Sequence, residues 1–312
     1  MKSLWLIAFC GAALWGVLPV NSAERGKFSL MTNDVVAFVG GSDVAAAQHS
    51  GHLESLLAMQ HKGVRFRNFG WEGDTVFERP RDVGFPSLLN NLEKAGVTVV
   101  VLQFGRGEGL SERRTVTEFR EAYKKLLDEL VPKFSTVILV TPVPFERGEG
   151  LTPDLSKRNP RLAEHAKVIR ELAHERSLPL IDLFGEAIKR SGPRLTSDGL
   201  QFTPAGQSVV AKLFMRQSGA VDLAGRVRDA NENGVWPDPK LEKVRQAVIA
   251  KNRLWFDYSR PQNWAFLGGD RTTQPSSRDH RDPKVRWFPN EMEKFLPLIA
   301  EAEKRLEEAA SR

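Results

Sequence analysis

Asp34-Val35-Val36-Ala37-Phe38-Val39-Gly40-Gly41-Ser42-Asp43 is the stretch that decides the fold. Its apolar run, 35–39, predicts a short strand buried on both faces, and the two glycines end that strand abruptly. A helical spacing of apolar residues begins at Val44, which places Ser42 in a strand-to-helix turn. Open sheets bind ligands at the carboxyl ends of their strands. Gly-Gly-Ser also suits a plain turn with a helix cap, and this stretch alone favours that simpler interpretation.

Strands and helices then alternate along the chain. Strand-like runs cover 64–70, 97–104, 137–140 and 180–183, and helical patterns cover 86–95, 116–130, 162–176 and a segment that begins at 204. Such alternation indicates a parallel sheet covered by helices on both faces. We therefore expect a flavodoxin-like, three-layer α/β/α sandwich with a five-stranded parallel sheet. Glycine-bearing loops at Ser42, Gly73 and Gly107 each follow a strand, so they should meet at one edge and form a site.

The first 23 residues, 1–23, have the layout of a secretory signal peptide. Lys2 precedes an apolar segment from 4 to 20, and small residues follow at 21–23. We expect cleavage there, no membrane span in the mature chain, and a secreted or periplasmic protein. An uncleaved anchor is the alternative, because about 17 apolar residues approach the minimum for a membrane span. The single cysteine, Cys10, lies in this segment, so no disulfide is expected.

The composition of the chain argues against some classes of function. The net charge is +6, but acidic and basic residues are interspersed, which argues against a nucleic-acid partner. No His or carboxylate pair has the spacing of metal ligands, so neither a metal nor another cofactor is expected. The sequence leaves the oligomeric state open.

The chain divides into a main domain and an extension. Residues 30–220 are expected to form the main domain, and 221–312 a C-terminal extension that packs on it. The extension should contain a polar linker at 222–238, helices at 241–253 and 290–310, and an aromatic loop at 255–287. These aromatic rings suit stacking on sugars, but we favour the interpretation that they anchor the extension.

Four blocks, in this order, resemble the SGNH/GDSL hydrolase superfamily. Gly40-Gly41-Ser42 is similar to its nucleophile block, with Gly41 in place of the usual aspartate. Residues 68–75 are similar to the oxyanion-glycine block, through Gly73. The third block, 105–108, has Gly107 where the family has asparagine, and the fourth, 198–201, keeps Asp198 but has Gln201 in place of histidine. Residues 251–253, 260–263 and 296–301 resemble the extension of a divergent exported subgroup from planctomycete-type bacteria.

The resemblance implies that Ser42 is the nucleophile, that the backbone N–H groups of Ser42 and Gly73 are oxyanion donors, and that Asp198 is the triad acid. Serine needs a base to accept its proton, and Gln201 does not titrate. Loss of one side-chain oxyanion donor, as at Gly107, costs about 3 kcal/mol.

Two functions therefore stay open. One is an exported hydrolase that acts on ester bonds, namely acyl groups on carbohydrate or envelope glycan. The other is a catalytically inactive protein of the same fold that binds a glycan or acylated ligand. A purely structural envelope protein is the third and least favoured alternative.

Three further charged side chains and the histidines also bear on the site. Arg79, Arg106 and Glu108 are candidates for substrate binding, because guanidinium groups suit sulfate, uronate or carboxylate. Ordinary surface charge is the alternative for the arginines, and an ionised Glu108 would repel an oxyanion. No histidine is expected beside Ser42: His49 and His52 should pack along the first helix, His165 and His174 should lie away from the loop edge, and His280 should be in the aromatic loop, which could fold over the site.

Overall fold

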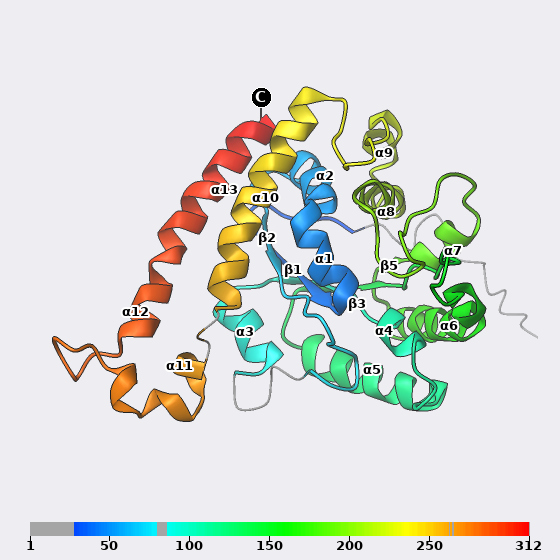
Figure 1. Cartoon of the computed structure of the whole chain (residues 1–312). Helices are drawn as coiled ribbons and strands as arrows, with labels where there is room; N and C mark the ends of the chain where they lie inside the picture. The colour runs from blue at the N-terminus through cyan, green and yellow to red at the C-terminus, as the bar shows by residue number, and fades with distance from the viewer. Residues whose placement is uncertain (1–27, 80–85, 262, 264, 312) are drawn as a thin grey trace, which may run out of the picture.

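The computed structural model describes residues 28–79, 86–261, 263 and 265–311. Within these ranges, five strands form one parallel sheet in the order β2-β1-β3-β4-β5 (Figure 1). The strands are β1 (Val35–Gly40), β2 (Arg65–Asn68), β3 (Val99–Gln103), β4 (Thr136–Val140) and β5 (Leu180–Ile181). The predicted signal peptide lies outside the described residues.

Strand β1 lies inside the sheet and is buried along its whole length. Because side chains alternate along a strand, Val36 and Phe38 point into one core, and Val35 and Val39 point into the other. Helices α1 (Ser42–Ser50), α2 (His52–Gln60), α8 (Pro204–Gln217) and α9 (Val221–Arg226) contribute to the first core. Helices α3 (Leu88–Lys94), α5 (Val116–Leu130) and α6 (Asn159–Glu175) contribute to the second. The expected three-layer sandwich is confirmed.

Local signals set the helix ends. Thr115 caps α5 and exchanges hydrogen bonds with Glu118, so this helix begins at Val116 as predicted. Thr203 caps α8 by accepting a hydrogen bond from the Gly206 N–H. The predicted first helix is split into α1 and α2 at Gly51, whose φ of +70° favours glycine. Short elements complete the main body: α4 (Arg106–Gly109), η3 (Leu155–Arg158) and α7 (Leu183–Ile188).

The C-terminal extension is mainly helical. Helices α10 (Pro239–Ser259) and α13 (Phe295–Ser311) lie side by side (Figure 1). Between them come α11 (Ala265–Gly268), η4 (Asp270–Thr272), η5 (Pro275–Ser277) and α12 (Trp287–Glu293). The expected linker at 222–238 contains most of α9, and the expected aromatic loop begins inside α10. Within the described ranges, no helix is both long and apolar enough to cross a membrane.

Helix α10 covers the free edge of the sheet. The Lys251 Nζ donates to the Phe66 carbonyl at 3.0 Å, and the Trp255 indole N–H donates to the Asn68 carbonyl at 2.7 Å. Both carbonyls belong to β2, which is an edge strand with unpaired backbone groups on its outer side. The extension therefore supplies hydrogen-bond donors to an edge strand that could otherwise pair with a strand of another chain.

A buried ion pair joins the extension to the first core. Lys251 Nζ lies 2.6 Å from the Glu54 Oε1 on α2, and the two side chains are 1% and 7% exposed. The Asn252 amide also donates to Glu54, at 3.0 Å. Because a buried charge is costly unless it is paired, loss of either Lys251 or Glu54 alone would be strongly destabilising.

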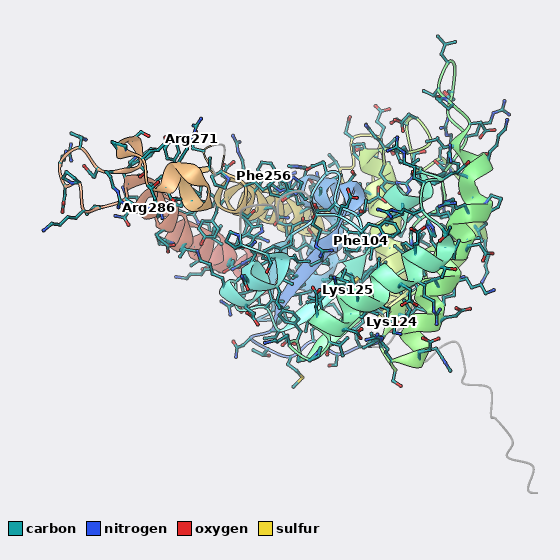
Figure 2. The ribbon with its side chains drawn as sticks, turned by 90° about the horizontal axis from the view of Figure 1, so that it is seen from below. Phe104, Lys124, Lys125, Phe256, Arg271 and Arg286 are labelled. Atoms are coloured by element: carbon teal, nitrogen blue, oxygen red, sulfur yellow. The ribbon has the colours of Figure 1, made fainter. Side chains whose placement is uncertain are left out.

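Aromatic side chains anchor the extension only in the part that lies next to the main domain. Trp255 is buried, and Trp236 is buried with its indole N–H donating to the Ser208 hydroxyl at 2.8 Å. In the outer part, aromatic rings pack on one another: Phe266, Trp287 and Phe288. Figure 2 shows Arg271 and Arg286 at this outer end, far from the main body, with Phe256 closer to it.

Candidate functional site

The candidate site lies at the carboxyl ends of β1, β2 and β3, which are neighbours in the sheet. The loops that follow these strands contain Ser42, Gly73 and Gly107, respectively. Trp71 N–H donates to the Gly40 carbonyl at 3.0 Å, so the second loop crosses directly beside the first. The strand order therefore brings together the three loops that the sequence predicts to meet.

Ser42 is the first residue of α1 and is exposed. Gly41 occupies the N-cap position, and no side chain caps this helix. The Ser42 hydroxyl forms no hydrogen bond to another described residue. The simpler interpretation, in which the serine serves as a helix cap, is therefore wrong, and its hydroxyl is available to a ligand.

Close packing explains both glycines before Ser42. A Cβ on Gly40 would lie 2.3 Å from the Gln103 carbonyl oxygen, and one on Gly41 would lie 2.7 Å from the Asp74 carbonyl oxygen. Neither backbone oxygen can move away as the end of a flexible side chain would. The loop that follows β2 thus excludes any side chain at position 41 without a local shift.

Gly73 lies at the exposed part of the second loop and has a φ of +84°. A Cβ there would contact nothing within 4 Å. Its conformation, rather than its packing, therefore favours glycine. Gly70, earlier in the same loop, packs closely on α1: a Cβ there would lie 2.5 Å from the backbone nitrogen of Ala45.

Glu108 holds two loops together. Its Oε1 accepts a hydrogen bond from the Val76 N–H at 2.7 Å, and its Oε2 accepts one from the Gly105 N–H at 2.8 Å. The side chain is buried, and burial raises its pKa. Both carboxylate oxygens are thus engaged by backbone donors, so the structure gives Glu108 a supporting position and not the ligand-facing one expected for substrate binding.

Gly107 is exposed, and a Cβ there would meet nothing within 4 Å. An asparagine side chain would fit in this space. Gly107 therefore supplies no side-chain donor at the position where the family has asparagine, although the space around it is open.

Asp198 and Gln201 form a tight turn. Asp198 Oδ1 accepts hydrogen bonds from the backbone N–H of Gln201 at 2.7 Å and of Leu200 at 2.9 Å. These bonds lower the pKa of Asp198, and the positive charge of Arg106 lowers it further. Gln201 is exposed. The aspartate is held in a defined place, but its neighbour at the histidine position cannot accept a proton at neutral pH.

The histidines lie elsewhere. All six are within the described ranges, and none hydrogen-bonds to Ser42. His165 Nδ1 is 3.0 Å from the Gly105 carbonyl, and its ring stacks on Phe119, so the expectation that it lies away from the loop edge is wrong. It supports the third loop from inside. His280 is 84% exposed and lies 3.7 Å from Asp279 in the outer part of the extension, so it does not fold over the site.

Arg106 is buried, with 5% of its side chain exposed. Its Nη1 donates to the Asp43 Oδ1 at 2.7 Å. The guanidinium lies over the Phe202 ring, 4.5 Å from its centroid, and near the Phe145 ring at 5.1 Å. The interpretation of this arginine as ordinary surface charge is therefore wrong.

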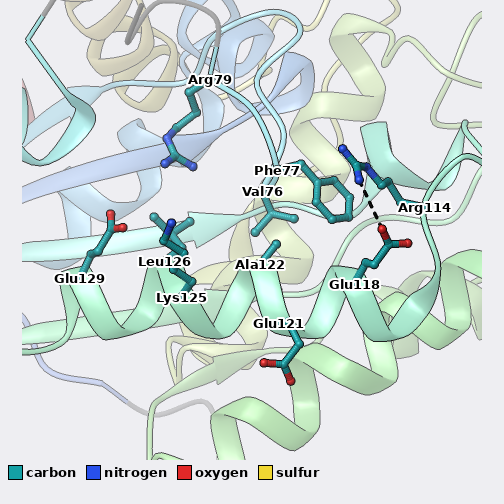
Figure 3. Close-up of a pocket in the computed structure, with 10 residues that line it drawn as sticks. All are labelled: Val76, Phe77, Arg79, Arg114, Glu118, Glu121, Ala122, Lys125, Leu126 and Glu129. Carbon is teal, nitrogen blue, oxygen red and sulfur yellow. Dashed lines mark hydrogen bonds and ion pairs between the residues drawn. The ribbon is translucent and has the colours of Figure 1, made fainter.

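Arg79 lies at a different place. It lines a pocket of about 320 Å³ between the 76–79 segment and α5, together with Phe77 and Arg114 (Figure 3). Arg114 is paired there with Glu118 at 3.3 Å. This pocket contains none of Ser42, Arg106 and Asp198 among its lining residues, so the structure separates the two predicted arginines.

A family model, the GDSL-like lipase/acylhydrolase family, matches residues 36–209, which is more than half of the chain. The chain belongs to this family. The matched range includes all four blocks around the site and ends within α8, before the extension. No curated protein matches the chain.

Solved structures share the GDSL-type fold. One is LAE5, an α/β hydrolase enzyme from the metagenome of Lake Arreo, Spain, at 18% identity and a TM-score of 0.50, covering 62% of this chain and 98% of that one. Another is a catalytic mutant of Axe2, an acetylxylan esterase from Geobacillus stearothermophilus, at 17% identity and a TM-score of 0.50, covering 62% of this chain and 97% of that one. At such identities the likeness concerns the fold.

Three residues of this GDSL-family site escaped sequence reasoning. Asp43 anchors Arg106, and its place directly after Ser42 was an available signal. Phe202 stacks on Arg106 and directly follows Gln201. Arg260, from the extension, donates to Glu72 at 2.7 Å, and no local pattern marks that contact. Among the described residues, no group of three or more His, Cys, Asp or Glu side chains is arranged to hold a metal ion.

Proposed function

We propose that the edge around Ser42 binds the ester group of an acylated carbohydrate or envelope glycan, and that this family member holds its ligand without efficient Ser-His-Asp turnover. The observation that carries this proposal is the isolated hydroxyl of Ser42. It is exposed at the start of α1, yet no imidazole among the described residues accepts its proton. A serine hydroxyl without a base is a weak nucleophile.

The ligand-binding features are retained. The first backbone N–H groups of a helix have no partner inside the helix, and α1 begins at Ser42 without a side-chain cap. Gly73 and Gly107, on the two neighbouring loops, each have open space where a Cβ would lie. These features suit an acyl oxygen, and they require no general base.

Slow hydrolysis at the same site is the second candidate. Ser42, Gly73 and Asp198 are kept at the positions of nucleophile, oxyanion donor and triad acid, and the Ser42 hydroxyl is unobstructed. A purely structural role would leave these features unused. In this second candidate a solvent molecule or ligand group replaces the missing imidazole as base.

Export is part of the proposal. It is supported by the signal-like sequence of residues 1–23, and a glycan ligand of the cell envelope requires it. N-terminal sequencing of the protein isolated from the culture medium or periplasm tests it, with a new N-terminus near residue 22–24 as the expected result.

Labelling with a fluorophosphonate probe separates the two candidates. Intact mass is read on the folded wild type and on Ser42→Ala. Absence of an adduct, together with binding of acetylated xylo-oligosaccharides, supports the binding protein; these probes are chosen because one structural neighbour is an acetylxylan esterase. An adduct found in the wild type and lost in Ser42→Ala supports the hydrolase. If the protein takes no label and binds no acylated glycan, both candidates fail.

A further inference from the structure

Arg106 carries two hydrogen-bond donors that the fold leaves unused. Its Nε and Nη2 are buried and have no hydrogen-bond partner. Leaving a buried donor unsatisfied costs about 1–3 kcal/mol, and more for a charged group. Buried polar groups in folded proteins are almost always paired, so this exception points to a partner that is not part of the chain.

The guanidinium contacts residues from two other loops of the site. Nη1 is bound to Asp43, the residue next to Ser42. Phe202, next to Gln201, stacks on the same group. Arg106 is also the residue directly before Gly107. The Arg106 side chain thus contacts the loops of Ser42 and Gln201, and Arg106 itself belongs to the loop of Gly107. These three residues stand at the family positions of the nucleophile, the histidine and the asparagine.

The charges around Arg106 indicate what kind of acceptor suits it. The Asp43 carboxylate neutralises the guanidinium, and Asp198 lies close enough for Arg106 to lower its pKa. A further full negative charge would meet these two carboxylates. A neutral carbonyl oxygen, which becomes more negative if a nucleophile attacks, avoids that repulsion and still accepts a charge-assisted hydrogen bond.

We propose that Arg106 donates from Nη2 or Nε to the carbonyl oxygen of the bound ester, and so supplies the side-chain donor that is missing at Gly107. The inference rests on the proposed ester-binding function and assigns the group that recognises the acyl part of the ligand. Gly107, where a Cβ would meet nothing within 4 Å, directly follows Arg106 in the chain. The Phe202 ring, which is only half buried, is the part of the enclosure that the acyl group displaces.

The test compares each probe with its deacylated form. Titration calorimetry gives the Kd of acetylated xylo-oligosaccharide and of the same oligosaccharide after deacetylation. The wild type should prefer the acetylated form at least about tenfold, and Arg106→Met should reduce this preference by about ten- to a hundredfold, as expected for a hydrogen bond to a charged group. Arg113→Met, which removes an exposed arginine between α4 and α5, is the matched control and should keep the preference.

A second measurement does not depend on how well Arg106→Met folds. The ¹H–¹⁵N signal of the Arg106 Nε–H, assigned by its loss in Arg106→Lys, should shift with the acetylated probe and not with the deacetylated one. An unmoved signal in protein saturated with the acetylated probe overturns the proposal, as does an unchanged preference in Arg106→Met. Equal binding of both probes by the wild type refutes ester recognition by Arg106 while glycan binding stands. If neither probe binds, the proposed function itself fails.

Discussion

The guanidinium of Arg260, at the end of α10, donates to the Glu72 carboxylate, 2.7 Å away. It also stacks on Trp71, at 4.3 Å from the ring centroid, and on Phe256 at 5.0 Å. Trp71 and Glu72 directly precede Gly73. The extension therefore holds the loop that contains Gly73, although the extension lies outside the range that matches the family.

Removal of this contact should loosen the loop. In Arg260→Ala, amide hydrogen exchange of residues 71–76 should become at least several-fold faster, because local protection depends on the contacts that hold a segment closed. Hydrogen-exchange mass spectrometry of that peptide measures the effect. Arg253→Ala removes an exposed arginine from the same helix and should leave the exchange unchanged. Equal exchange in both variants would show that Arg260 does not hold the loop.

Restoration of the two missing groups should create a hydrolase. In Gly107→Asn/Gln201→His, the new imidazole lies three residues after Asp198, and the new amide enters open space. A general base and an oxyanion donor each contribute about 100-fold or more in natural enzymes, so even an imperfect geometry should raise p-nitrophenyl acetate hydrolysis at least about tenfold over the wild type. The same variant with Ser42→Ala should return to the wild-type rate. A gain that persists without Ser42 would mean that the new imidazole acts alone in solution.

Acid should destabilise the protein through His52. Burial lowers the pKa of His52 from 6.5 to about 4, and its Nε2 lies 2.7 Å from the Gly234 carbonyl. Between these pH values the unfolded chain binds more protons than the folded one. The stabilisation is thus complete above pH 6.5 and is lost as the pH falls toward 4, by about 3 kcal/mol in total.

Urea unfolding at pH 7.5 and pH 5 measures this loss. His52→Gln keeps a side-chain N–H donor but does not titrate, so its free energy of unfolding should depend less on pH than that of the wild type. His174→Gln, at an exposed position, should show the wild-type dependence. Parallel curves for wild type and His52→Gln would exclude His52 as the acid-sensitive group.

Glu108→Gln should destabilise the fold. The carboxylate accepts one backbone N–H on each oxygen, and a glutamine places an NH₂ group against one of those donors. One buried N–H then loses its acceptor, at a cost of about 1–3 kcal/mol. Chemical denaturation measures the change, and the exposed Glu121→Gln is the control. Equal stability of the two variants would contradict the supporting role of Glu108.

Sequence alone gave a correct account of the sheet because strand and helix signals are local. The apolar run at 35–39 and the Thr115 cap each act within a few residues, and the structure places both elements as predicted. The loops of Ser42, Gly73 and Gly107 could be brought together because parallel strands all present their carboxyl ends at one edge.

The contacts inside the site could not be predicted in the same way. Arg106 is buried because Phe145 and Phe202 come from loops 39 and 96 residues further along the chain. Arg260 reaches Glu72 across 188 residues. Gly41 stands where the family has aspartate because the Asp74 carbonyl oxygen leaves no room for a side chain. The spacing of residues in the sequence does not reveal that contact. Such details depend on tertiary packing, which periodicity does not encode.

The Lys251–Glu54 pair has a consequence for the history of the chain. Glu54 belongs to the part that matches the family, and Lys251 lies beyond it. Loss of the Lys251 charge in the intact chain would leave the Glu54 carboxylate buried beneath α10 without a counter-charge, which is strongly destabilising. An uncharged residue at position 251 should therefore arise only together with, or after, a change of position 54 to an uncharged residue, and homologues that keep the extension should carry both charges or neither.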